Sequence, residues 1–218
     1  NDISHEKLIE IDIDNLSKLS FSTIVKSKMR NSFSKPESYW FKGFGNKMTH
    51  AWIYKPISID NNKPPLIVKA HSGPTSVFDG SFNLEVQYWT SRGWFVAEVN
   101  YGGSTGFGRD YRERLNNLWG VLDSADCIAL AKSLVEEQFI DPSRIVISGN
   151  SAGGFTALNA LYQTDIFRAA FCKYPVIDLN DMRLNTHRFE RNYLNSLIGN
   201  FKDNKNILEY NPEEETHA

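Results

Sequence analysis

The chain has 218 residues, which is enough for one domain with a substantial core. Hydrophobic residues make up 41% of it and charged residues 23%, as is ordinary for a globular protein. The 24 Lys and Arg residues nearly balance the 26 Asp and Glu residues, so the charge gives no reason to expect nucleic acid or an anionic membrane as a partner. The longest apolar runs, such as residues 94–97, are too short to cross a bilayer.

The two cysteines, Cys127 and Cys172, both lie in apolar stretches and have no partners at the spacing of a metal site. Free cysteines are among the most buried residue types, so we interpret both as buried thiols outside any disulfide framework. This usage fits a reducing compartment and favours a cytoplasmic location.

The first residues differ from the rest of the chain. Ile9, Ile11 and Ile13 alternate with acidic residues, which is the period-two pattern of a half-buried strand. Residues 15–17 are typical of a turn. Because a lone strand is not stable by itself, we interpret residues 1–17 as the remnant of a preceding β-rich domain and residues 18–218 as the main domain.

A strand hairpin is predicted next. Residues 39–41 and 51–54 are rich in aromatic and β-forming side chains, and Gly45-Asn46 between them suits a positive φ angle. The polar run of residues 60–65, which includes two prolines, indicates a loop after the hairpin.

From residue 66 onward, short apolar runs alternate with helical patterns. Strands are predicted over residues 66–68, 94–99, 144–148 and 167–172. Helices are predicted over residues 81–92, 152–162 and 188–198, and from residue 121 to an end near residues 141–142. Strands that alternate with helices imply right-handed crossovers and a mainly parallel sheet covered on both faces. The fold class is therefore predicted as α/β.

Residues 149–154 read Gly-Asn-Ser-Ala-Gly-Gly and stand between a β-branched run and an apolar helix. This is the Gly-x-Ser-x-Gly nucleophile elbow in the strand–turn–helix setting that it requires. Ser151 is the predicted nucleophile, and the backbone N–H of Ala152 at the start of the helix is a predicted oxyanion donor. The alternative is a glycine-lined turn of another α/β protein, and the placement of the pattern favours the elbow.

A second loop, His71-Ser72-Gly73-Pro74, directly follows the strand at residues 66–68. An α/β-hydrolase takes a second oxyanion donor from the loop after an early strand, and glycine there lets the backbone approach closely. We predict Gly73 as this donor, with a plain Gly-Pro turn as the alternative. His71 precedes the nucleophile, whereas this fold orders its triad as Ser, acid and His, so we interpret His71 as structural.

A third segment, residues 100–109, is rich in glycine and follows a predicted strand. It contains neither a G-x-G-x-x-G register nor a Gly-Lys-Ser/Thr sequence, so a phosphate-binding function is not expected. We interpret it as a shaped loop beside the active site. No cofactor and no metal are expected.

Residues 71–74, 100–109, 141–144 and 149–154 together resemble the prolyl oligopeptidase family of serine peptidases, closest to its acylaminoacyl-peptidase and dipeptidyl-peptidase-like branches. The resemblance implies an α/β-hydrolase fold, preceded by a β-propeller whose last strand would fall within residues 7–17. It also implies Ser151 as the nucleophile and the N–H groups of Gly73 and Ala152 as the oxyanion hole. Many relatives have two glycines after the histidine where this chain has Ser72 and Gly73, but the donor glycine is kept.

A triad also needs an acid and a histidine after Ser151. The downstream candidates are Asp165, Asp178, Asp181, Asp203, His187 and His217. In this fold each partner follows a further strand, and a strand–helix–strand unit takes about 30 residues or more. After Pro175 no convincing buried strand remains, since residues 188–198 predict a helix and residues 212–215 a solvated acidic loop. The fold is therefore expected to be incomplete, with the acid and His beyond residue 218.

These observations predict a serine-type peptidase that hydrolyses peptides through an acyl-enzyme on Ser151, although this chain alone is expected to be nearly inactive. Two alternatives stay open. One is an esterase or lipase of the same fold, and the other is a non-catalytic scaffold. A peptide substrate is the expected partner, whereas nucleic acid and membrane are not; oligomeric state and exo- or endopeptidase specificity stay open.

Overall fold

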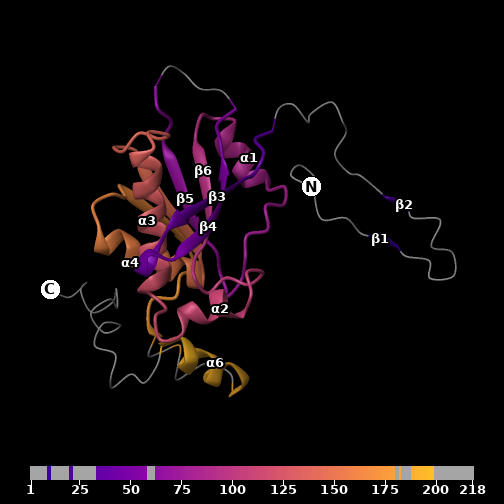
Figure 1. The fold of residues 1–218 in the computed structure, drawn as a ribbon, viewed down its shortest axis with the longest axis vertical. Helices are drawn as coiled ribbons and strands as arrows, with labels where there is room; N and C mark the ends of the chain where they lie inside the picture. Colours follow the sequence, from indigo (N-terminus) through magenta and orange to yellow (C-terminus); the bar gives the residue numbers. More distant parts are fainter. Residues whose placement is uncertain are drawn as a thin grey trace.

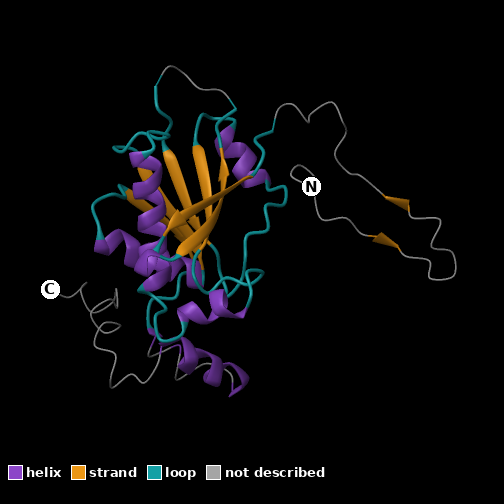
Figure 2. Ribbon diagram, in the orientation of Figure 1, coloured by secondary structure: helices purple, strands orange, loops and turns teal. Residues whose placement is uncertain are grey.

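A computed structural model of the protein describes residues 9–10, 20–21, 33–57, 62–179, 182 and 188–198. The main body is a six-stranded sheet in the order β3-β4-β6-β5-β7-β8, with helices on both faces (Figure 1, Figure 2). Its strands are β3 (Glu37–Lys42), β4 (Met48–Tyr54), β5 (Leu66–Ala70), β6 (Phe95–Asn100), β7 (Ile145–Asn150) and β8 (Ala169–Lys173). Strands β6, β5, β7 and β8 run parallel, and β4 is antiparallel to β3 and β6. The predicted α/β class with a mainly parallel sheet is confirmed.

The hairpin β3–β4 forms as predicted. Its strands pair in a register that places Trp40 opposite His50, and a 3₁₀ turn, η2 (Phe44–Asn46), joins them. Gly45 and Asn46 both have positive φ angles, of 61° and 57°. Glycine and asparagine are the residues that adopt this conformation at least cost, which explains why the turn is placed here.

Two layers of helices cover the sheet. The helices are α1 (Leu84–Thr90), α2 (Arg109–Arg112), α3 (Leu122–Glu136), α4 (Ala152–Gln163) and α6 (Arg188–Ile198), with a 3₁₀ helix η3 (Glu113–Leu115) after α2. Helices α3 and α4 pack on the face that carries Val68, Ala97 and Ile147, which belongs to the larger apolar core. Helix α1 packs through Val86 on the opposite face, against Val96.

The boundaries differ from prediction at two helices, α1 and α3, and α3 ends at Glu136 rather than near residue 141. Helix α1 begins at Leu84 rather than at residue 81, because the Asn83 side chain accepts hydrogen bonds from the N–H groups of Glu85 and Val86 and so caps the helix. Helix α2 and η3, at residues 109–115, were not predicted. By contrast, the helix predicted over residues 188–198 has these same bounds in α6.

Strand β8 lies at the edge of the sheet and is only half-buried, since its alternate residues are exposed. This position corrects one prediction: Cys127 is buried on α3, but Cys172 is only partly buried because it lies on the edge strand. Phe171 on the same strand is 60% exposed. One face of β8 is therefore open within the described part of the chain.

Near the N-terminus, β1 (Ile9–Glu10) pairs antiparallel with β2 (Ser20–Phe21). The strand predicted from the Ile9 pattern is thus seen at its first two residues. Its continuation, the turn predicted at residues 15–17 and the loop predicted at residues 212–215 lie outside the described residues. The boundary at residue 17 stays a prediction.

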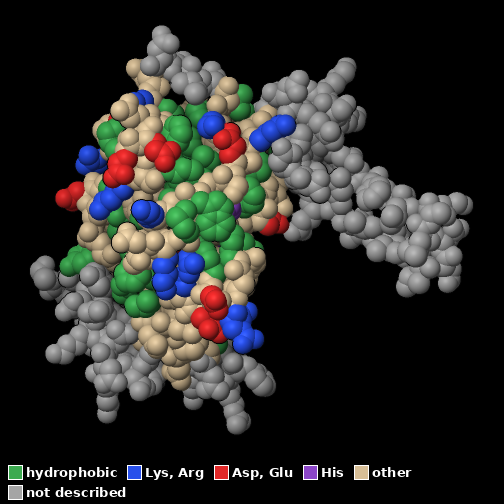
Figure 3. Space-filling model, in the orientation of Figure 1, with side chains coloured by type: hydrophobic (Ala, Val, Ile, Leu, Met, Phe, Trp, Pro, Cys, Tyr) green, Lys and Arg blue, Asp and Glu red, His purple; other side chains and the backbone are tan. Residues whose placement is uncertain are grey.

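Charged side chains of both signs are interspersed over the face shown in Figure 3, and no single-sign patch gathers there. Among the described helices, none is both long and apolar enough to span a membrane.

Candidate active site

Ser151 stands at the junction between the carboxyl end of β7 and the first residue of α4. Its backbone has φ 52° and ψ −120°, a combination that non-glycine residues rarely adopt. Such a conformation costs about 1–3 kcal/mol and is typical of functional sites. The side chain is partly exposed. The predicted strand–turn–helix setting is therefore present, with a strained serine at its apex.

The glycines around Ser151 are required by close packing. A Cβ on Gly149 would lie 2.0 Å from the carbonyl oxygen of Gly153, and a Cβ on Gly153 would lie 2.3 Å from the carbonyl oxygen of Ala70. A Cβ on Gly154 would lie 2.7 Å from the Pro175 side chain. These distances are far below van der Waals contact, so the turn keeps this geometry only with glycine at each position.

The backbone of Ser151 is also held by the end of β8 and by the segment that follows this strand. The Ser151 N–H donates to the carbonyl of Lys173 at 3.1 Å, and the Ser151 carbonyl accepts from the N–H groups of Gly154 at 2.9 Å and Val176 at 3.2 Å. Backbone groups from two neighbouring elements thus hold the strained residue in place.

The loop that carries Gly73 meets the elbow directly. A Cβ on Gly153 would lie 2.6 Å from the carbonyl oxygen of His71, so the first turn of α4 packs against the end of β5 and the start of this loop. Gly73 has φ 122°, a conformation that only glycine adopts without strain. The N–H of Ala152 is the first of α4, and an N–H at this position has no acceptor within its own helix. The structure thus brings Ser151, Ala152 and Gly73 to one edge of the sheet.

His71 is buried and engaged on both sides of its ring. Its Nδ1 donates to the Ser72 carbonyl at 2.8 Å, and its Nε2 lies 2.7 Å from the Ser104 hydroxyl oxygen. The ring stacks on Tyr101 with 4.2 Å between centroids. Burial lowers the pKa of His71 to about 4, which keeps the ring neutral at physiological pH. These contacts fit the structural interpretation of His71.

His50, the other histidine in the described ranges, is buried on β4. It accepts from the Asn100 amide at 3.1 Å and contacts the Ser38 hydroxyl at 3.0 Å. Burial lowers the pKa of His50 to about 4 as well. Neither described histidine therefore has a ring nitrogen free to act as a base for Ser151.

The predicted acid and histidine candidates fall into two groups. Asp165 lies beyond the carboxyl end of α4, and a 12-residue helix is about 18 Å long, so it stands far from the elbow. Asp178 is half-buried in the segment after β8. The other candidates, Asp181, Asp203, His187 and His217, lie outside the described residues. Within the described ranges, no histidine and acid pair comes together at Ser151.

Tyr193 on α6 contacts the Gly73 loop and was not expected there. Its hydroxyl donates to the Gly73 carbonyl at 3.4 Å and lies 2.7 Å from the Thr75 hydroxyl. The helix is anchored because Ser196 and Leu197 accept backbone hydrogen bonds from the segment before α3. The sequence predicted this helix, but it holds no local signal for a contact across more than a hundred residues.

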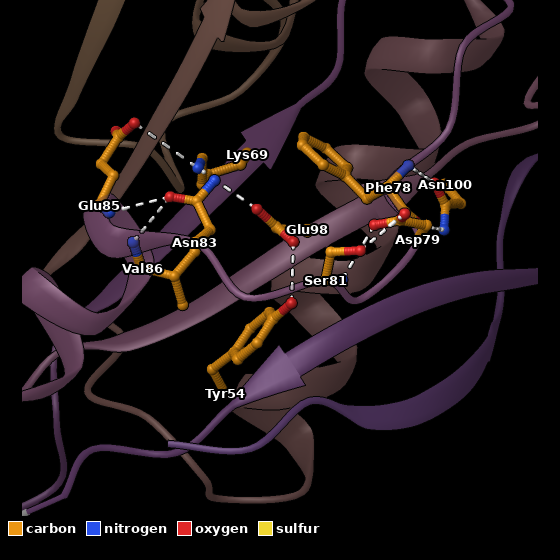
Figure 4. A network of polar contacts seen from close by, with 10 residues as sticks. All are labelled: Tyr54, Lys69, Phe78, Asp79, Ser81, Asn83, Glu85, Val86, Glu98 and Asn100. Carbon is orange, nitrogen blue, oxygen red and sulfur yellow. Dashed lines mark hydrogen bonds and ion pairs between the residues drawn. The ribbon is translucent and has the colours of Figure 1, made fainter. Parts of the chain in front are cut away.

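A buried charged network lies beneath the same edge, on the α1 side of the sheet (Figure 4). Lys69 on β5 and Glu98 on β6 are opposite residues, 3.3 Å apart at Nζ and Oε1, and Tyr54 donates to the other Glu98 oxygen at 3.0 Å. Glu85 on α1 lies 3.8 Å from Lys69. Burial raises the pKa of Glu98, while Lys69 opposes this rise. The strand patterns gave no sign of this pair, because buried strands are read from apolar residues.

Two cavities lie at opposite ends of the strands, one at their carboxyl ends and one at their amino ends. One of about 230 Å³ borders the elbow and is lined by Lys69, Ser72 and Asn150 among others. A larger one, of about 620 Å³, is lined by Pro65, Trp94 and other residues at the amino ends of the central strands. The larger cavity is thus remote from Ser151.

Comparison with known proteins agrees with this geometry. A model of the prolyl oligopeptidase family matches residues 80–217. The acylamino-acid-releasing enzyme of Arabidopsis thaliana is 34% identical over 143 residues, which are 65% of this chain and 19% of that protein. The crystal structure of puromycin hydrolase gives a TM-score of 0.84 at 39% identity, and the alignment covers 94% of this chain and 32% of that chain.

A puromycin-hydrolyzing peptidase of Mycobacterium tuberculosis gives a TM-score of 0.81 at 38% identity, over 89% of this chain and 32% of that chain. The chain thus spans less than a third of the length of each of these three proteins.

Proposed function

Since this chain belongs to the prolyl oligopeptidase family, we propose that it supplies the nucleophile and oxyanion hole of a serine peptidase, with Ser151 as the attacking residue. The strained backbone of Ser151 is the observation that carries this proposal. A protein that only binds or scaffolds gains nothing from a serine held at φ 52°, whereas a nucleophile does, because the turn projects its hydroxyl above the sheet.

The proposed reaction is acyl transfer to Ser151. The Ser151 Oγ attacks the carbonyl carbon of a peptide bond, and its proton passes through a histidine to the leaving amine as the C–N bond breaks. The N–H groups of Ala152 and Gly73 stabilise the tetrahedral oxyanion, with help from the positive end of α4. Water then hydrolyses the acyl-enzyme and restores Ser151.

The histidine and the acid of the triad are proposed to lie outside the described residues. Residues 1–218 by themselves are proposed to turn over peptides only very slowly. Substantial turnover by a preparation of these residues alone, with its mass verified, would contradict this part of the proposal.

We also propose that residues 1–17 end a preceding β-rich domain and that the protein acts in the cytoplasm. The alternation of Ile9, Ile11 and Ile13 with acidic residues supports the first statement, and the two free cysteines support the second. Peptides are the proposed substrates, because the related proteins are named as peptidases and as acylamino-acid-releasing enzymes.

The proposal is tested with the native protein as it is produced in its own cells. Matched aminoacyl amides and short acyl esters are the substrates. A peptidase should cleave the amides, and Ser151→Ala should abolish this activity while the exposed control Ser143→Ala leaves it unchanged. Cleavage of esters alone would favour an esterase of the same fold. Amide cleavage that survives Ser151→Ala would overturn the proposal.

A further inference from the structure

The glycine-rich segment at residues 100–105, called the brace here, lies against the loop at residues 71–78, which carries Gly73. Five hydrogen bonds join the two. The Tyr101 hydroxyl donates to the His71 carbonyl at 3.0 Å, and the Thr105 N–H donates to the Ser76 carbonyl at 3.0 Å. The Ser104 hydroxyl meets His71 Nε2 at 2.7 Å.

The remaining two bonds come from one amide. The Asn100 side chain accepts from the Phe78 N–H at 2.7 Å and donates to the Phe78 carbonyl at 2.9 Å (Figure 4). Asn100 therefore pairs with Phe78 as a neighbouring strand would, at the far end of the loop.

Three polar side chains of the brace are fully buried. Asn100, Tyr101 and Ser104 are each 0% exposed. A buried polar group that loses its hydrogen-bond partner is costly, so each of these contacts strongly favours one loop conformation. The brace therefore defines the path of residues 71–78 rather than merely touching it.

The brace is itself held in place by hydrogen bonds to Asp126 and Tyr111. The buried carboxylate of Asp126 accepts from the Gly102 N–H at 2.8 Å, and the Gly103 N–H donates to the Tyr111 carbonyl at 2.9 Å. Gly103 has φ 116°, and a Cβ there would lie 2.7 Å from Leu115. The glycines thus let the segment turn sharply inside the core.

The bond between Ser104 and His71 connects to Gly73 through the imidazole ring. Because His71 Nδ1 donates to the Ser72 carbonyl, the neutral ring presents a lone pair at Nε2. The Ser104 hydroxyl lies 2.7 Å from this nitrogen and 2.7 Å from the Tyr101 carbonyl oxygen, so the two acceptors share its single proton. The chain of contacts runs from Ser104 through the imidazole to the Ser72 carbonyl. That carbonyl belongs to the peptide group whose N–H is the one on Gly73.

We propose that Ser104 and His71 are positioning residues that aim the Gly73 N–H at the oxyanion. This inference rests on the proposed function of the site. The peptide group between Ser72 and Gly73 is planar, so a hydrogen bond to its oxygen fixes the direction of its N–H. Active-site groups must be held to within about 0.5 Å, and the brace supplies this support.

The first test replaces Ser104 by alanine in the protein as its own cells make it. We expect kcat for an oxoester to fall by about 10–100-fold, somewhat less than the loss of a whole oxyanion donor, with KM within about threefold. The kcat for the matched thionoester should fall far less, because its larger sulfur atom is stabilised only weakly by an oxyanion hole. Ser143→Ala, an exposed serine that bonds Asp141, is the control and should change neither rate.

A pair of variants at His71 sharpens the test. His71→Asn keeps a donor near the position of Nδ1 but cannot reach Ser104, whereas His71→Gln can reach Ser104 but gives up the Nδ1 position. If the Gly73 N–H is oriented through the Ser72 carbonyl, the His71→Asn variant should retain more of the oxoester kcat than the His71→Gln variant. Equal losses on oxoester and thionoester in every variant would indicate general loosening and overturn the proposal.

A measurement independent of turnover separates this inference from the proposed function. Amide hydrogen exchange at residues 72–78 should rise about tenfold in Ser104→Ala and stay unchanged in Ser143→Ala, because local opening then costs less. Unchanged exchange would overturn the inference even if Ser151 is the nucleophile. If the parent protein shows no turnover that depends on Ser151, the proposed function fails, and exchange alone then decides whether the brace holds this loop.

Discussion

Two glycine-rich segments lie at the carboxyl edge of the central sheet, and they use glycine for different purposes. At the elbow, Gly149 and Gly153 allow backbones to touch, and the serine between them is strained and partly exposed. In the brace, Gly102 and Gly103 let the chain fold into the core. Buried polar side chains around them then find hydrogen-bond partners.

The two segments differ in backbone strain and in the hydrogen bonding of their buried polar groups. Ser151 occupies an unfavourable conformation that only its surroundings maintain. Asn100 and Ser104, by contrast, have partners for their buried polar atoms. We conclude that the strained elbow is suited to chemistry. The brace, whose buried polar atoms are hydrogen-bonded, is suited to supporting the loop beside it. Four substitutions test this contrast.

Gly153→Ala should have the largest effect. Alanine is the better helix former, so any loss must come from the collision of its Cβ with the Ala70 carbonyl oxygen, 2.3 Å away. Overpacking against backbone should lower the free energy of unfolding by about 3 kcal/mol or more. Urea denaturation measures this change, and a loss below about 1 kcal/mol would show that the elbow has room to relax.

Asp126→Asn should change how stability depends on pH. Burial raises the pKa of Asp126 to about 6, so its protonated form favours the fold at low pH, and this contribution is lost as the pH rises through 6. The free energy of unfolding of the variant, relative to the parent, should therefore improve by about 2 kcal/mol between pH 4 and pH 7.

Urea denaturation at the two pH values provides the measurement for Asp126→Asn. The exposed Asp141, whose pKa its hydrogen bonds with Ser143 lower to about 2, offers a control. Asp141→Asn should show no comparable improvement. A relative stability of Asp126→Asn that is the same at both pH values would contradict the assigned cause.

Ser151→Gly should stabilise the protein while it removes the nucleophile. Glycine tolerates φ 52° without the steric cost that serine bears, so we expect a gain of about 1 kcal/mol in the free energy of unfolding. Ser151→Ala keeps a Cβ and should show no such gain, which makes it the matched control. Equal stabilities of the two variants would mean that the elbow is not strained.

Gly108→Ala should have the smallest effect. Gly108 has φ 89°, but a Cβ added there would have no other atom within 4 Å, so only the backbone conformation is penalised. We expect a loss of about 1 kcal/mol. Gly103→Ala, which adds a collision with Leu115, should cost clearly more in the same thermal or urea measurement.

Much of the fold was predictable because it depends on local patterns. The buried β-branched run before Ser151 and the apolar helix after it predicted β7 and α4 closely. The hairpin followed from Gly45 and Asn46, whose conformational freedom marks the turn. The elbow motif placed Ser151 between strand and helix for the same reason.

The parts that were missed depend on contacts distant in sequence. Nothing near Tyr193 indicates that it meets Gly73, and the ion pair of Lys69 with Glu98 appears only when β5 and β6 lie side by side. The partial exposure of Cys172 follows from strand order, which places β8 at an edge. Local periodicity carries no information on any of these.

The central claim, that Ser151 is an activated nucleophile, is tested most directly by intact-mass spectrometry after treatment with a fluorophosphonate. The protein as its own cells make it should gain a single adduct, and Ser151→Ala should gain none. An adduct that persists in Ser151→Ala, or its absence from a parent protein that cleaves peptides, would contradict the account.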